Sequence, residues 1–136
     1  MPDAPPRPAA IAVSPLAVSA IVVSYNTRQM TLDCLRALID DLRDIPSEII
    51  VVDNASTDSS PDAIRDNFPG VKLIGNSDNR GFGAANNQGM LASNGDNILL
   101  INSDAFPKPG AVAAMLATLS AHADAGLVGP RLLNAD

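Results

Sequence analysis

The chain has 136 residues, the length of one domain, and 46% of them are hydrophobic while 18% are charged. This composition supports a folded core and excludes a chain that is disordered throughout. Nine lysines and arginines stand against fifteen aspartates and glutamates, so the net charge is −6. An acidic balance argues against nucleic-acid binding, which needs a basic face to neutralise phosphates, and against a polybasic membrane anchor.

One cysteine, Cys34, excludes an internal disulfide, and one histidine, His122, excludes a metal centre built from histidines. We expect Cys34 to pack in a helix as a small apolar residue. We expect His122 to be a solvated residue at a helix end, where the helix dipole favours it.

Residues 1–17 are predicted to form a disordered leader rich in proline and alanine, and residues 18–136 to form one domain. The leader also loosely resembles a signal peptide, because Arg7 precedes mostly apolar residues. Pro15 interrupts this stretch, and no apolar run approaches the roughly 20 residues of a membrane helix. We therefore favour the leader and keep the signal peptide as the alternative.

The hydrophobic pattern predicts alternating strands and helices. Buried strands are predicted at Val18–Ser24, Glu48–Val52, Val71–Ile74 and Asn97–Ile101, with a further strand beginning at Gly126–Val128. Helices are predicted at Thr31–Leu42, Ser60–Phe68, Phe82–Ser93 and residues 107–121, with Ser60 as an N-cap and Gly95 as a C-cap. The alternation predicts an α/β fold, a three-layer α/β/α open and mostly parallel sheet. Because a strand begins just before the chain ends, we expect a truncated form of a longer fold.

Polar segments follow all four predicted strands. They are Ser24–Thr27, Asp53–Asp58, Asn76–Gly81 and Asn102–Asp104. Ligands of open parallel sheets bind beyond the carboxyl ends of the strands, so these segments predict a polar-ligand site at one edge of the sheet. Asn, Asp and Ser are also ordinary turn residues, and the residues alone leave both interpretations open.

The familiar nucleotide-binding loops are missing. No G-x-x-x-x-G-K-[ST] sequence occurs, and Gly81–Asn86 departs from G-x-G-x-x-G at its last position. The glycines there suit a phosphate at a helix N-terminus, and Arg80 would add a charge-assisted contact. Asp104, just past an apolar strand, is placed to hold a hard divalent cation on phosphate oxygens. Asp53 is placed to accept hydrogen bonds from a base or ribose.

Four segments together resemble the inverting glycosyltransferases of family two, which have the GT-A fold. They are Ile21–Asn26, Ile49–Asp58, Asn79–Gly89 and Leu99–Asp104. The segments stand in the family's order and at the expected strand ends, and the resemblance extends from Ser19 to Arg131. They are most similar to the rhamnosyltransferase-like members, which build bacterial surface polysaccharides. The resemblance implies a Rossmann-like half that binds nucleotide-diphospho-sugars.

The resemblance also implies roles for particular residues. The implied nucleotide-sugar-binding residues are Ser24, Tyr25, Asn26, Asp53, Asn54, Asp78, Asn79, Arg80, Gly81, Asn102 and Ser103. Asp53 matches the aspartate that reads the nucleobase, and Tyr25 and Asn26 match the place where base and ribose rest. Asp104 matches the last aspartate of the family's D-x-D motif, which binds Mg²⁺ or Mn²⁺ on the diphosphate. Asn102 stands at the first position of that motif and brings no charge.

The implied donor is a UDP- or dTDP-sugar, and the implied acceptor is a glycan or lipid-linked molecule of polysaccharide or cell-wall synthesis. The implied location is the cytoplasm, including peripheral association with the inner face of the membrane. In the family, the acceptor half follows the D-x-D strand and supplies a carboxylate base. Neither Asp124 nor Asp136 lies in a base-like motif, so the catalytic base is unknown and we expect it to be absent from this chain.

Two other classes stay open. A non-catalytic nucleotide-sugar-binding fragment or assembly module would be completed by a partner chain or a second copy, because an unfinished sheet exposes an edge. A flavodoxin-like or receiver-type domain also ends strands on aspartates. A receiver, however, needs an acidic pair after its first strand, and Ser24–Asn26 has none.

Overall fold

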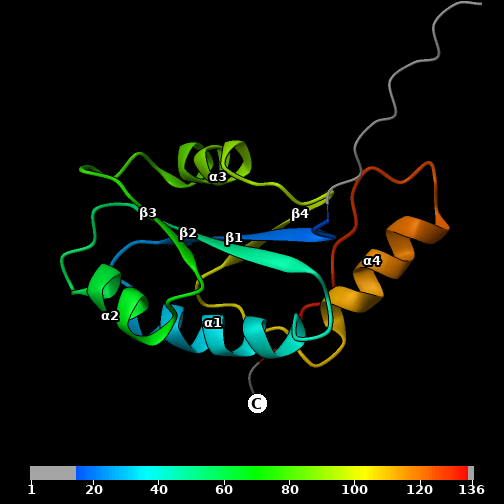
Figure 1. Ribbon diagram of the computed structural model, residues 1–136, viewed down its shortest axis with the longest axis horizontal. Helices are drawn as coiled ribbons and strands as arrows, with labels where there is room; N and C mark the ends of the chain where they lie inside the picture. The colour runs from blue at the N-terminus through cyan, green and yellow to red at the C-terminus, as the bar shows by residue number, and fades with distance from the viewer. Residues whose placement is uncertain (1–14, 135–136) are drawn as a thin grey trace, which may run out of the picture.

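The computed structural model describes residues 15–134. Strands and helices alternate through this part of the chain (Figure 1). They are β1 (Val18–Ser24), α1 (Arg28–Asp41), β2 (Ser47–Asp53), α2 (Ser60–Asn67), β3 (Lys72–Gly75), α3 (Phe82–Leu91), β4 (Asn97–Asn102) and α4 (Ala111–Ala121). The predicted alternation is therefore confirmed over these residues.

The strands form one sheet in the order β3-β2-β1-β4, and each neighbouring pair is parallel. Figure 1 shows α3 on one face of the sheet and α1 and α2 on the other, which confirms the predicted three-layer fold. The register places Ser24 beside Asp53, and Asp53 beside Gly75. The carboxyl ends of neighbouring strands therefore lie at one edge of the sheet.

The core has two parts because both faces of the central strands are covered. On the α1 face, Val22 of β1 and Val51 of β2 pack with Leu35 of α1. On the α3 face, Ile50 and Val52 of β2 pack with Ala85 of α3. Burial on both faces explains the uninterrupted apolar runs in these two strands. Each fully buried Val, Leu or Ile contributes about 1.5–3 kcal/mol.

The structure corrects the role predicted for Gly95. α3 ends at Leu91, and its C-cap is Ala92 in the right-handed conformation. Gly95 passes so close to β1 that a Cβ there would lie 2.6 Å from the backbone nitrogen of Ser19. A helix cap and a close backbone approach both favour glycine, so the local sequence could not separate them.

The predicted helix starts also need correction. α1 begins at Arg28, three residues before the predicted Thr31, and Ser60 is the first residue of α2 rather than its N-cap. Asp58 serves both helices, because its carboxylate accepts the backbone N–H of Arg28 at 2.9 Å and that of Ser60 at 3.0 Å. Burial by itself would raise the pKa of Asp58, but hydrogen bonds from Ser60 and Arg28 outweigh it and hold the pKa below its ordinary value.

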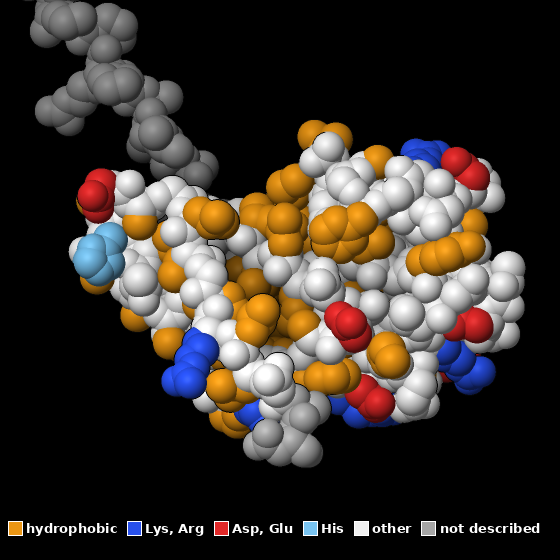
Figure 2. Space-filling view, turned by 180° about the vertical axis from the view of Figure 1, so that it is seen from behind, with side chains coloured by type: hydrophobic (Ala, Val, Ile, Leu, Met, Phe, Trp, Pro, Cys, Tyr) orange, Lys and Arg blue, Asp and Glu red, His pale blue; other side chains and the backbone are white. Residues whose placement is uncertain are grey.

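β4 differs from the predicted strand that is buried on both faces. Leu99 and Ile101 pack against the core, while Ile98 is 41% exposed and Leu100 is 49% exposed. β4 lies at the edge of the sheet, and α3 packs against β1 and β2 instead. Figure 2 shows hydrophobic side chains gathered around a hollow on the face opposite to the view of Figure 1.

The predicted strand at Gly126–Val128 is wrong, because residues 126–134 form no strand. Leu127 is 91% exposed and does not reach the sheet. Gly129 and Pro130 follow at once, and proline cannot donate a ladder hydrogen bond. The apolar residues at 126–134 therefore pair with no strand among the described residues.

Most of the predicted leader, residues 1–14, lies outside the described residues. Its end is tied to the sheet. The Ala17 N–H donates to Pro46 O at 2.8 Å, and Leu16 O accepts the N–H of Asp96 at 3.0 Å. Across residues 15–134, no helix has both the length and the apolar character needed to cross a membrane.

Candidate functional site

An open cleft of about 450 Å³ lies at the carboxyl edge of the sheet. Its lining comes from the ends of β1, β2 and β4, the starts of α1 and α3, and the loop before α3. The residues are Val23, Tyr25, Thr27, Met30, Asn54, Asn79, Gly81, Phe82, Asn102, Ser103 and Asp104. The structure thus gathers Tyr25, Asn54, Asn79, Gly81, Asn102, Ser103 and Asp104 from the predicted site. Ser24, Asn26, Asp53, Asp78 and Arg80 are outside the lining.

Asp53 lies at the end of β2 and is 2% exposed. Its two carboxylate oxygens accept the backbone N–H of Ser56 at 2.9 Å and the Ser56 hydroxyl at 2.6 Å. These bonds hold a tight turn in which Ala55 adopts a φ of 65°. Asp53 therefore shapes the turn after β2, and its burial keeps it out of the lining of the cleft.

Asn26 joins the loops that follow β1 and β2. Its backbone N–H donates to Ser56 Oγ at 2.9 Å, and its Oδ1 accepts the Thr57 N–H at 2.7 Å. Asn26 has a φ of 51°, in the region that asparagine tolerates better than most residues. This bridge holds the preceding residue, Tyr25, 49% exposed at the cleft.

A chain of hydroxyl groups runs beneath the cleft. Ser24 Oγ lies 3.2 Å from Thr31 Oγ1, which lies 3.0 Å from Thr27 Oγ1. Thr27 then donates to Ser103 Oγ at 3.2 Å. Ser24 is fully buried, so it supports the site from inside and does not face a ligand. Thr27 lines the cleft. It belongs to the predicted polar segment Ser24–Thr27 but not to the implied nucleotide-sugar-binding residues, and its bond to Ser103 spans 76 residues of the chain.

Asp104 places an exposed carboxylate at the cleft, beside the neutral oxygens of Asn102 and Ser103. Over the described residues, no group of three or more His, Cys, Asp or Glu side chains could hold a metal ion. A metal here would depend on one carboxylate together with ligand phosphates and water. Mg²⁺ is commonly held in this way, so the oxygens of this set fit a hard cation that a diphosphate helps to bind.

Cys34 lies below this end of β4. It is fully buried, and its Sγ donates to Asn102 O at 3.6 Å. Burial, with a further contribution from the Asp104 carboxylate, raises the pKa of the thiol to about 12. The thiol therefore stays neutral at ordinary pH, which agrees with the predicted inert role and excludes a thiolate nucleophile.

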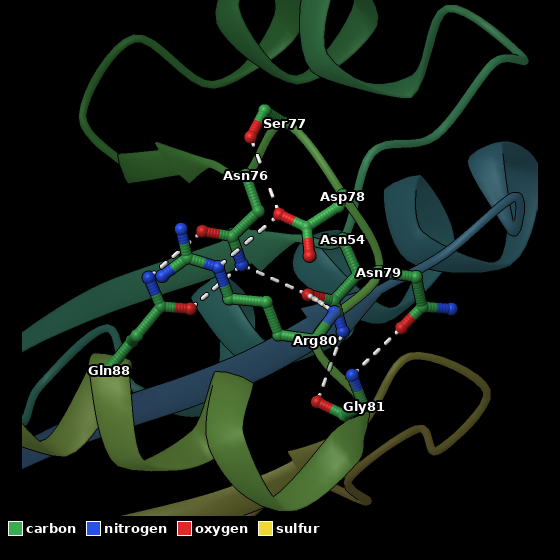
Figure 3. Close-up of polar contacts among 8 residues, drawn as sticks. All are labelled: Asn54, Asn76, Ser77, Asp78, Asn79, Arg80, Gly81 and Gln88. Carbon is green, nitrogen blue, oxygen red and sulfur yellow. Dashed lines mark hydrogen bonds and ion pairs between the residues drawn. The ribbon is translucent and has the colours of Figure 1, made fainter.

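The loop before α3 is held by a network of side-chain amides (Figure 3). Asn54 Oδ1 accepts Asn76 Nδ2 at 2.9 Å and the Arg80 N–H at 3.4 Å, and Asn54 Nδ2 donates to Gly81 O at 3.2 Å. Asn76 and Gln88 exchange two hydrogen bonds, at 2.7 and 2.9 Å. The sequence analysis missed the roles of Asn76 and Gln88, which become visible only when α3 packs on the sheet.

The Arg80 guanidinium lies near Asp78, with Nε 3.7 Å from Oδ1, and both side chains are exposed. Exposed pairs of this kind contribute little to stability, so the Arg80 side chain is free to change partner. In the same loop, Asn79 Oδ1 accepts the N–H of Gly81 at 2.9 Å.

Two apolar side chains of the cleft were also missed. Met30 is 53% exposed in the first turn of α1, and Phe82 is 58% exposed at the start of α3. For Met30 a signal was available, because a large apolar residue stands among polar residues at the start of α1; Phe82 is followed by glycine and alanine and gave no such signal. Together with Tyr25 they add apolar and aromatic surface to the otherwise polar lining of the cleft.

Residues 19–135 match the pattern of Glycosyl transferase family 2. This match covers most of the chain, and the chain therefore belongs to that family. None of the curated proteins compared with it matches.

Two solved structures show the same GT-A fold. The mannosyltransferase PcManGT from Pyrobaculum calidifontis, in complex with GDP-Man and Mn²⁺, has a TM-score of 0.70 and 27% identity over 84% of this chain. TarS 1–349 from S. aureus in complex with UDP-GlcNAc has a TM-score of 0.70 and 24% identity over 79% of this chain. The chain covers 36% of the first protein and 32% of the second.

Proposed function

We propose that this chain is the donor-binding part of an inverting glycosyltransferase and binds a UDP- or dTDP-sugar with a divalent metal ion. The observation that carries the proposal is the cleft itself. It combines one exposed carboxylate, Asp104, with neutral polar groups and the exposed side chains of Tyr25, Met30 and Phe82. A nucleotide diphosphate needs the same combination: charge neutralisation at the phosphates and a flat apolar surface for the base.

Some residues of the cleft would contact the diphosphate of such a donor, and others its base and ribose. Asp104, with oxygens of Asn102 or Ser103, would hold Mg²⁺ or Mn²⁺ against the diphosphate. When bound, the metal would neutralise charge on the leaving diphosphate. Arg80 would leave its weak pair with Asp78 to contact a phosphate. Tyr25 and Asn79 would contact the base or ribose, and the buried Asp53 would do so after a movement of the turn that covers it.

Metal use gains support from PcManGT, whose structure holds GDP-Man and Mn²⁺. The choice of a UDP- or dTDP-sugar, rhamnosyl transfer, and a glycan or lipid-linked acceptor of surface polysaccharide rest on the resemblance of the sequence. Transfer at the cytoplasmic face of a membrane belongs to the same proposal. We assign no catalytic base to this chain.

Calorimetric titration with UDP, dTDP and GDP, each with and without Mn²⁺, tests the proposal. We expect Mn²⁺-dependent binding of at least one nucleotide. In Asp104→Ala that affinity should fall by about tenfold or more, which corresponds to the loss of one strong charge contact. Asp124→Ala is the matched control, because Asp124 is exposed beyond α4, and it should bind as the unaltered chain does.

A folded chain that binds none of the three nucleotides would contradict the proposal. Equal binding by Asp104→Ala would remove the metal role of Asp104 and leave nucleotide binding intact. A glycosyl-transfer assay on the same samples separates the enzyme from the non-catalytic module, because nucleotide binding without transfer is expected of the module.

A further inference from the structure

Asn54 faces the cleft, yet both ends of its side-chain amide are engaged within the protein. The residue is 2% exposed. Its Oδ1 accepts the Arg80 N–H, and its Nδ2 donates to Gly81 O. One side chain thus binds the backbone on both sides of the Arg80–Gly81 peptide bond. Gly81 has a φ of 82° and accepts the N–H of Ala85 in the first turn of α3.

The Asn54 amide is itself oriented by a second amide. Asn76 Nδ2 donates to Asn54 Oδ1 at 2.9 Å and to Gln88 Oε1 at 2.7 Å. Gln88 Nε2 donates back to Asn76 Oδ1 at 2.9 Å. Figure 3 shows the three side chains in series, with Gln88 reaching from α3 and Asn54 lying against the loop. Gln88 lies outside the lining of the cleft, so an effect of Gln88 on a ligand must pass through Asn76 and Asn54.

We propose that Asn54, Asn76 and Gln88 are positioning residues, which hold Asn79 and Gly81 in their ligand-ready arrangement before a nucleotide arrives. The inference rests on the proposed function, because the loop matters to a nucleotide only if the cleft binds one. A loop that is ordered in advance loses less conformational entropy on binding, and its affinity is correspondingly higher. The amide series supplies this order from Gln88 and Asn76, outside the lining of the cleft, through Asn54 at its wall.

The test removes the outermost amide and measures the loop and the ligand separately. Gln88→Ala leaves Asn76 Oδ1 without its donor, and the Asn76 amide is then free to rotate away from Asn54. We expect hydrogen exchange of the Arg80 and Gly81 amides, followed by NMR, to accelerate by about tenfold, while exchange in β1 is unchanged. The Kd for UDP or GDP with Mn²⁺ should rise by a similar factor.

The matched control is Asn87→Ala, which removes an exposed amide from the adjacent position of α3 and should change neither quantity. Gln88→Met, which keeps the length of the side chain and removes its hydrogen bonds, should reproduce Gln88→Ala and replaces it if that variant does not fold. Unchanged exchange at Arg80 and Gly81 overturns the proposal. Faster exchange with an unchanged Kd overturns the positioning role alone, whereas an unaltered chain that binds neither nucleotide overturns the proposed function and the positioning role with it.

Discussion

Gly89 of α3 lies directly against Ile21 of β1. A Cβ added at Gly89 would lie less than 3.0 Å from Cγ2 of Ile21, a separation that real Cβ atoms do not show. Ile21 is fully buried in the central strand, so it cannot give way without moving its neighbours. The absence of a side chain at one position therefore determines how closely α3 approaches the sheet.

We predict that Gly89→Ala destabilises the chain. Alanine gains about 1 kcal/mol of helix propensity over glycine, but overpacking a filled core costs about 1–3 kcal/mol. The clash is with the inner methyl of a branched side chain, which places the overpacking cost in the upper part of this range, so we expect a net loss of about 1–2 kcal/mol in urea unfolding. Gly83→Ala is the control, because a Cβ there meets no atom within 4 Å, and it should be neutral or stabilising. Equal stability of the two variants would contradict the close packing.

The two faces of β4 should respond differently to the same substitution. Leu99 packs against the core, whereas Leu100 is 49% exposed. We expect Leu99→Ala to lower the free energy of unfolding by about 2 kcal/mol or more, and Leu100→Ala by about 1 kcal/mol or less. Chemical denaturation of the two variants checks this. A larger loss for Leu100→Ala would show that its face of β4 is covered in solution.

Asp58 should make stability depend on pH. Its pKa lies below the ordinary value of 3.8 in the folded chain, so its ionised form stabilises the fold above pH 3.8. This contribution is lost as the pH falls from 3.8 through the lower pKa of the folded state. Asp58→Ala should cost about 1 kcal/mol near pH 7, the usual effect of losing a helix cap.

Thermal unfolding from pH 7 to pH 2 measures the difference between Asp58→Ala and the unaltered chain. The difference should shrink steadily below pH 3.8. Asp66→Ala, which removes an exposed carboxylate of α2, should show no comparable trend. A difference that is constant with pH would mean that the charge of Asp58 contributes nothing.

Cys34 should resist alkylation in the folded chain. Burial and the nearby Asp104 carboxylate raise the pKa of its thiol to about 12, and the thiolate is the reactive species. With iodoacetamide at pH 8, we expect modification at the rate of global unfolding and a jump to the rate of a free thiol in denaturant. Fast modification without denaturant would show that α1 opens locally.

The four strands of the sheet were predictable because their signal is local. The predicted strand Val18–Ser24 matches β1 residue for residue, because a strand buried on both faces is mostly apolar, as residues 20–23 are here. The start of α1 was not predictable, because the carboxylate that accepts its first N–H belongs to Asp58, thirty residues further along the chain. The role predicted for Gly95 failed for a related reason, since its neighbour Ser19 lies 76 residues earlier in the chain.

Part of the candidate site was predictable from the sequence, and part was not. The polar strand ends could be identified from the sequence, because a parallel sheet brings its carboxyl ends to one edge. The hydrogen-bond partner of each polar side chain could not be identified in this way. Ser24 and Asp53 form their hydrogen bonds with neighbouring residues inside the protein. Gln88 lies on α3, and its partner Asn76 comes within reach only when that helix packs on the sheet. A sequence pattern predicts where a side-chain amide lies in the fold, but not which group it hydrogen-bonds.

The strand order β3-β2-β1-β4 has a consequence for the time at which the cleft can exist. β1 and β4, the first and the last strand within residues 15–134, pair with each other, and Thr27 bonds to Ser103, 76 residues away. Contacts of such long sequence separation form slowly, because the intervening chain must be closed into a loop first. A growing chain that has not yet emerged past Asp104 has no cleft, so a nucleotide cannot assist the early folding of β1, β2 and β3. A nucleotide can stabilise the protein only once β4 has docked on β1.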